Sequence, residues 1–228
     1  MTATSQVGSA AGIAAGQPLV LRHLSDYHKT SPRTRHSFWA MTTTPELFRQ
    51  RADRFSAVVD AVPIQDWDAP SPCAGWSARD VLHHVISTER EFLAGHGANP
   101  GPEPDLADPV GAWHRHVDAV AQALGPDGFA ETRYDSWFGP TTVGATMVDV
   151  YGWDLIIHAW DLARAGGLPL EFADEELDAA QAGLEGFGES VYSPGICARP
   201  VDVATDASRQ DHLLARTGRD PQWSPDPQ

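Results

Sequence analysis

Basic residues are scarce in this sequence. Its 228 residues include 16 Lys and Arg against 31 Asp and Glu, which gives a formal net charge of −15. Proteins that bind nucleic acid or anionic membrane surfaces through charge present clusters of basic residues. The composition therefore predicts neither a nucleic-acid partner nor a membrane partner.

Cysteine is nearly absent as well. Cys73 and Cys197 allow one disulfide at most, and neither has the spacing of a zinc-binding motif. No apolar run is long enough to span a membrane, and no basic segment precedes an apolar one as in a secretory signal peptide. These features predict reduced thiols and a cytoplasmic protein.

Several catalytic motifs are missing too. The sequence contains no glycine-rich phosphate-binding loop, no Gly-x-Ser-x-Gly and no His-Glu-x-x-His. Nucleotide binding, serine hydrolysis and this class of zinc protease therefore lack support.

Helical patterns fill most of the chain after residue 41, and strand signals are few. Thr44 is the predicted N-cap of the first helix, with Pro45 at the first helical position. Ser77 with Asp80 predicts a capping box, and Gly166 predicts a helix end. We expect long helices over about 44–62, 77–93, 110–124 and 142–165, shorter ones over 173–192 and 206–220, and an extended piece within 132–137. The predicted fold class is all-α, a bundle of four principal helices with short additional C-terminal helices.

Residues 1–41 differ from the rest of the chain. Small residues come first, then a basic stretch without helical periodicity, and Met41 opens a segment that reads like a natural protein start. We expect residues 1–41 to be a disordered or mis-annotated N-terminal extension, and residues 42–224 to form the helical bundle.

A carboxylate and an imidazole lie one helical turn apart in the segment GWDLIIHAWDLARAGG. Asp154 and His158 are four residues apart, so both project from one helix face. Their neighbours are apolar nearly all round, which indicates a buried helix in which Asp and His need partners. Such a pair can hold a divalent metal if a third ligand comes from elsewhere. A solvent-exposed pair or a capping network is the alternative for this spacing.

The second predicted helix offers the third ligand. His83 and His84 point about 100° apart, so at most one faces the bundle interior, and the local pattern does not separate them. We assign Asp161, three residues beyond His158, to orientation or packing, because three protein ligands suffice. Arg164, near the end of the helix, fits the helix dipole and could pair with an acid. We expect it to be structural, with recognition of a substrate anion as the alternative.

Two further candidates are weaker. His114 and Asp118 repeat the four-residue spacing, but polar neighbours indicate a solvated face. Cys73 precedes a helix start, a position that can lower the pKa of a thiol, although a buried structural cysteine is the simpler interpretation.

Three segments in order resemble one known family: PSPCAGWSARDVLHHV, HAWDLARAGG and ARPVDVATDASRQDHLLARTGRDPQW. They resemble the actinobacterial metal-binding proteins grouped with mycothiol-dependent maleylpyruvate isomerase, within the DinB-like superfamily. The resemblance covers about residues 42–224 and implies a DinB-like four-helix bundle that holds a divalent metal, usually taken as zinc. Carried over by position, the metal ligands fall on His84 rather than His83, and on Asp154 and His158. The isomerase has Glu at the position of Asp154.

The resemblance also implies a function. It points to a metal-dependent transferase or isomerase in which zinc activates a small-molecule thiol, with mycothiol as the expected thiol, for attack on a small electrophilic substrate. Two alternatives are a non-catalytic bundle that binds a metal or small ligand, and a metal-dependent hydrolase or lyase that uses no thiol. The sequence predicts no oligomeric state, no particular substrate and no catalytic residue beyond the metal ligands.

Deletion of residues 1–40 tests the predicted boundary. We expect the shortened protein to keep its fold and metal content, because the removed segment shows no amphipathic period. Circular dichroism and thermal unfolding of both chains would check this. A melting temperature lower by several degrees after truncation would contradict it.

Overall fold

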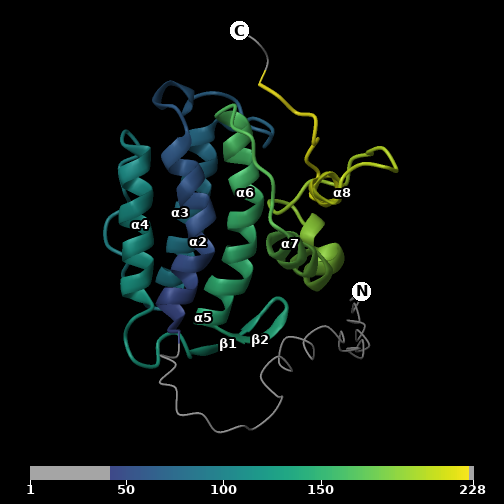
Figure 1. The fold of residues 1–228 in the computed structure, drawn as a ribbon. Coiled ribbons are helices and arrows are strands. Elements are labelled where there is room, and N and C mark those ends of the chain that lie inside the picture. The colour runs from purple at the N-terminus through teal and green to yellow at the C-terminus, as the bar shows by residue number, and fades with distance from the viewer. Residues whose placement is uncertain (1–41, 226–228) are drawn as a thin grey trace, which may run out of the picture. The chain divides into compact units, whose positions relative to one another are not determined.

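Four long helices run side by side in the computed structural model, which describes residues 42–225 (Figure 1). Helix α2 contacts α4 and α6, and α3 contacts the same two helices, so the four form the sides of a bundle. The predicted all-α, DinB-like four-helix bundle is confirmed. The bounds of these helices are Thr44–Ala61 for α2, Ala78–Gly95 for α3, Pro109–Ala123 for α4 and Gly152–Ala165 for α6.

The expectation for residues 1–41 lies outside the described residues. The proposed division between this extension and a bundle over 42–224 therefore stays a prediction. Within residues 42–225, none of the helices combines the length and the apolar character that crossing a membrane requires.

The helix starts follow the capping residues closely. The prediction of Thr44 as the first N-cap is wrong by one residue: Thr43 has the extended backbone of the cap, and its N–H donates to Glu46 at 2.7 Å. A glutamate three residues after Thr43 completes a capping box there, which fixes the start. The predicted box at the start of α3 is confirmed, since Ser77 N–H donates to Asp80 at 2.9 Å.

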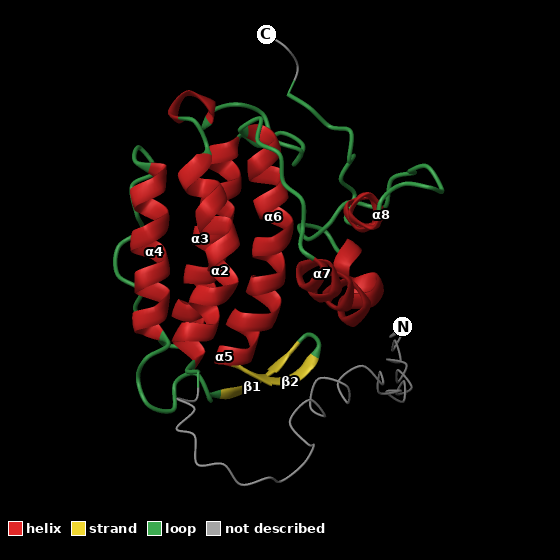
Figure 2. Cartoon of the chain, viewed as in Figure 1, coloured by secondary structure: helices red, strands yellow, loops and turns green. Residues whose placement is uncertain are grey.

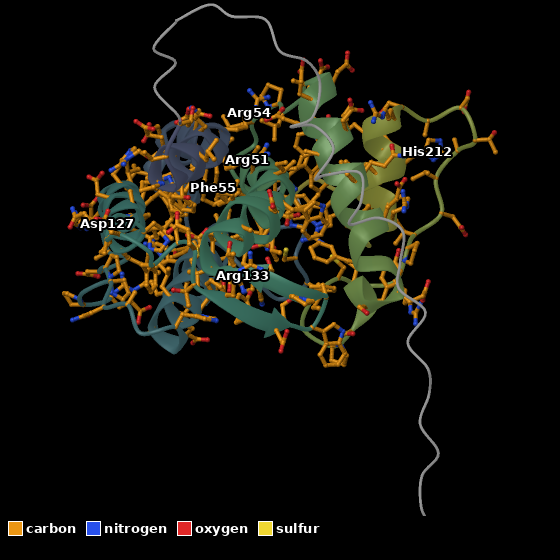
Figure 3. The ribbon with its side chains drawn as sticks, turned by 90° about the horizontal axis from the view of Figure 1, so that it is seen from below. Arg51, Arg54, Phe55, Asp127, Arg133 and His212 are labelled. Atoms are coloured by element: carbon orange, nitrogen blue, oxygen red, sulfur yellow. The ribbon has the colours of Figure 1, made fainter. Side chains whose placement is uncertain are left out.

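Helix α2 shows how the bundle separates apolar from charged side chains. Phe55 is fully buried and lies 4.7 Å from the Trp113 ring of α4, whereas Arg51 and Arg54 stay on the exposed side of the helix (Figure 3). The Trp113 indole N–H donates to the Ser56 hydroxyl at 2.8 Å, so the buried polar atom has a partner. Each such buried ring stabilises the fold by about 1.5–3 kcal/mol.

The segment between α3 and α4 runs back along α3. Near one end of α3, Arg90 donates to the carbonyls of Pro100 and Gly101, and near the other end Arg79 donates to the Leu106 carbonyl. The chain therefore returns to the end at which α3 began before it enters α4. As a result α3 and α4 point in the same direction.

A buried polar pair joins the same two helices. The Glu89 carboxylate and the His116 ring lie 2.8 Å apart, and both side chains are inaccessible to solvent. Burial raises the pKa of Glu89 despite this partner. The sequence did not predict the pair, whereas His114, on the other side of α4, is half exposed beside Asp60 as its neighbours indicated.

A short hairpin and a π-helical turn precede α6. Strands β1 (Arg133–Ser136) and β2 (Gly139–Thr142) pair antiparallel and are the only strands within residues 42–225 (Figure 2). The sequence indicated the first strand but not the second. The long helix predicted over 142–165 is divided into α5 (Val143–Ala145), a π-helical turn (Thr146–Tyr151) and α6.

Helix α7 (Asp174–Phe187) packs beside α6, and α8 (Arg209–Arg216) packs against α7, both outside the four-helix bundle (Figure 1). The Trp153 indole of α6 donates to the Ala180 carbonyl of α7 at 2.9 Å. The same indole lies directly against Gly183, where a Cβ atom would overlap it. The absence of a side chain at residue 183 is therefore what permits α7 to approach α6 this closely.

Two glycines of α7 should respond oppositely to alanine. Gly183→Ala should destabilise the protein by about 1–3 kcal/mol, because its methyl group collides with Trp153. Gly186 is exposed, and nothing lies within 4 Å of the Cβ it lacks, so Gly186→Ala should stabilise by about 0.5–1 kcal/mol. Urea denaturation of both variants checks the pair. Equal effects would show that α7 does not pack through Gly183.

Candidate metal centre

Three side chains converge between α3 and α6. His84 of α3 places Nε2 at 3.9 Å from Oδ2 of Asp154, and His158 Nε2 lies 3.4 Å from Oδ1 of Asp154. One donor atom from each of the three lies within 4.8 Å of the others. The structure thus brings together the three residues that the sequence analysis named as metal ligands.

The neighbouring histidine is directed elsewhere. The His83 side chain is 54% exposed, and its Nε2 lies 3.1 Å from the Glu103 carboxylate. His84, by contrast, packs against the His158 ring at 5.1 Å between centroids. Of the two adjacent histidines, His84 is therefore the one that faces α6.

Asp161 contacts the His158 ring at Nδ1, on the side away from His84 and Asp154. Its carboxylate is fully buried and lies 2.9 Å from His158 Nδ1, which must carry a proton to donate to it. Nε2 is consequently the nitrogen that faces His84 and Asp154. Burial opposes charge on this imidazole, but Asp154 and Asp161 outweigh burial and raise the pKa of His158 to about 10. Both carboxylates therefore favour positive charge at this place.

Arg219 completes this arrangement from beyond α8. Its Nη2 donates to Asp161 Oδ2 at 2.8 Å and its Nε donates to Oδ1 at 3.2 Å, so the contact is bidentate. Although burial opposes it, Arg219 holds the pKa of Asp161 well below its usual range. Arg219 was not predicted from the sequence. A buried Asp needs a cationic partner, but the sequence does not show which arginine supplies it.

Both cysteines lie beside Arg219. Cys73 Sγ is 3.2 Å from Asp161 Oδ2 and 3.6 Å from Nη2 of Arg219, and Cys197 Sγ is 3.7 Å from Nη1. Cys73, His158 and Asp161 form a second cluster of possible metal donors. There, however, the guanidinium of Arg219 already supplies the positive charge. The half-buried Cys73 donates its S–H to Asp161, in keeping with a structural thiol.

Trp76 covers one side of the two histidines. Its ring lies 4.9 Å from the ring of His84 and stacks on His158 at 6.4 Å. The side chains of His84 and Asp154 are each 26% exposed, against 6% for His158. Solvent therefore reaches this centre from the side of His84 and Asp154.

The donor set fits a divalent metal such as zinc. Two imidazole nitrogens and one carboxylate oxygen are typical zinc ligands, and three protein ligands leave a coordination position for another molecule. A carboxylate behind one ligating histidine is the usual outer-shell partner in such centres, and Asp161 has that position.

Arg164 is part of the scaffold. Its Nη2 donates to the Pro221 carbonyl at 3.0 Å, and its guanidinium lies over the Trp160 ring at 5.2 Å. It thereby fastens the C-terminal segment to the end of α6. This contact agrees with the structural role expected of it.

Comparison with known proteins adds a family relationship. Residues 48–126, which include α3, match the family model described as the mycothiol maleylpyruvate isomerase N-terminal domain. An uncharacterized protein of Mycobacterium tuberculosis is 32% identical over 145 residues, which are 60% of this chain and 78% of that protein. A second uncharacterized protein of this organism is 27% identical over 150 residues, 53% of this chain and 55% of its own length. No solved structure matches the chain.

The buried Asp161–Arg219 pair can be tested by double substitution. Asp161→Asn should destabilise the protein by about 3–5 kcal/mol, because it leaves the Arg219 charge buried without its partner. Adding Arg219→Met should recover part of this loss, since the unpaired charge is gone. Urea denaturation of the single and double variants gives the coupling. Strictly additive losses would contradict the pairing.

Proposed function

We propose that this chain, which belongs to the mycothiol maleylpyruvate isomerase N-terminal domain family, is a divalent-metal-dependent transferase or isomerase that uses a small-molecule thiol. Mycothiol is the thiol that the family description suggests, and a small electrophile is the substrate. The observation that carries the proposal is the convergence of His84, Asp154 and His158 on one point, with Asp161 behind His158.

His84, Asp154 and His158 would hold the metal, with zinc as the proposed ion. When bound, zinc supplies a Lewis acid that keeps a coordinated thiol deprotonated near neutral pH. Asp161 is not a ligand in this proposal. It orients His158 through Nδ1 and is itself fixed by Arg219, so Nε2 is directed at His84 and Asp154.

The surroundings of the centre support a thiol that comes from outside the protein. Cys73 is directed at Asp161 and Arg219, on the Nδ1 side of His158 rather than the side that faces His84. Burial raises the pKa of Cys197 and keeps that thiol protonated. Cys73 thus approaches His158 only on the side away from His84 and Asp154, whereas His84 and Asp154 are partly exposed to solvent.

Metal content tests the ligand set. We expect about one zinc per chain, lost in His84→Ala and in His158→Ala because two ligands hold the ion poorly. His83→Ala is the matched control and should keep its zinc, since this side chain points away. Elemental analysis of protein purified without chelator measures this. Loss of zinc from His83→Ala with retention by His84→Ala would reverse the assignment.

Thiol consumption tests the activity. Zinc-loaded protein supplied with mycothiol and a panel of electrophiles that includes maleylpyruvate should consume thiol, or isomerise the electrophile with thiol present. His84→Ala should be inactive in the same assay. Turnover that needs zinc but no thiol would instead indicate a hydrolase or lyase. Zinc binding without turnover of any compound would favour a binding role.

A further inference from the structure

Tyr151 is close to two of the proposed ligands along the helices that carry them. It precedes Asp154 by three residues, and its hydroxyl reaches Thr88, which follows His84 by four residues. The backbone of Tyr151 is therefore about one turn from Asp154, and the carbonyl that its hydroxyl contacts is about one turn from His84 along α3. The order along the chain is Tyr151, Asp154, His158, and His158 is the buried member of the three ligands. Tyr151 thus lies beyond the half-buried Asp154, on the side away from the buried His158.

The Tyr151 hydroxyl can exchange its present hydrogen bond for one to another acceptor. Tyr151 donates to the Thr88 carbonyl at 3.2 Å. Thr88 lies inside α3, where its carbonyl also accepts from the backbone N–H four residues on. Replacing the bond from Tyr151 therefore leaves no carbonyl unpaired. The nearby Tyr134 differs, because its hydroxyl lies 2.6 Å from the Thr146 hydroxyl, a short bond between two side chains.

The phenol is also held in its protonated form. The ring of Tyr151 packs against Phe92 at 5.3 Å and is partly buried. Burial, together with the carboxylates of Glu89 and Asp154, raises the pKa of Tyr151 well above its usual value. At physiological pH this side chain can therefore donate a hydrogen bond.

We propose that Tyr151 contacts the bound molecule: its phenolic O–H donates to an oxygen of the ligand whose sulfur is held by the metal. The inference rests on the proposed function and adds a residue that recognises the substrate. It favours thiols that carry an acceptor oxygen a few bonds from the sulfur. Apolar thiols of the same class gain nothing from Tyr151.

Two thiols bound to cobalt-loaded protein test this. Cobalt(II) replaces zinc as a visible probe, and a thiolate bound to it gives a sulfur-to-metal charge-transfer band whose titration yields a dissociation constant. Ethanethiol has no oxygen, whereas 3-mercaptopropionate carries a carboxylate two methylene groups from the sulfur. Only the second thiol can accept from Tyr151.

Tyr151→Phe should weaken binding of 3-mercaptopropionate about three- to tenfold, as expected for loss of one hydrogen bond, and leave ethanethiol unchanged. Tyr134→Phe is the matched control and should change neither thiol, because its hydroxyl is committed to Thr146. Cobalt content and melting temperature are measured for each variant. A larger loss for the thiol with the carboxylate than for ethanethiol is an effect that general loosening of the site would not produce.

Three results would overturn the inference. Equal weakening of both thiols, or of neither, would show that Tyr151 does not donate to the ligand. Loss of cobalt from Tyr151→Phe would show that the tyrosine supports the metal centre instead. Absence of a charge-transfer band in the unaltered protein with both thiols would refute thiol coordination itself. That outcome would count against the proposed function, and it can be told from failure of the Tyr151 inference because it is seen in the unaltered protein.

Discussion

The carboxylate of Asp161 is buried where water does not reach it, and the region around the centre is organised by its need for partners. An isolated buried carboxylate costs far more than the marginal stability of a protein allows, so its oxygens must be matched. His158, within α6, makes one contact with the Asp161 carboxylate. Arg219 of the C-terminal segment makes two, and Cys73 of the loop before α3 makes one. Three separate parts of the chain are thereby joined at one side chain.

The two ring nitrogens of His158 lie in different environments, because Asp161 occupies only the Nδ1 side. On the Nδ1 side the charges are internal to the fold, since Asp161 is balanced by Arg219. On the Nε2 side, Asp154 and His84 face partly exposed space, and no arginine lies within salt-bridge distance of this carboxylate in the described residues. The two clusters of possible metal donors share the His158 imidazole. The cluster with Cys73 and Asp161 already contains a cation, the guanidinium of Arg219.

Much of this fold follows from local sequence signals. Capping residues, glycine and proline set the helix boundaries, and the spacing of Asp154 and His158 places both on one face of α6. His84 could be separated from His83 only by the family resemblance, because a local pattern does not show which side a neighbouring helix will occupy. Arg219 could not be predicted, since its contact with Asp161 joins residues 58 apart in the chain. The π-helical turn also escaped prediction, because its residues read as ordinary helix.

Almost every residue of α6 is buried or makes a specific contact, so few of its positions can be substituted without effect. Twelve of its fourteen residues are buried, and the two others are Asp154 and Arg164. The first belongs to the metal centre, and the second fastens the C-terminal segment. Substitutions in α6 therefore alter either the packing or the chemistry. Sequence divergence among proteins of this architecture should accumulate on the outer faces of α2 and α7, while α6 remains the slowest-changing part of the chain.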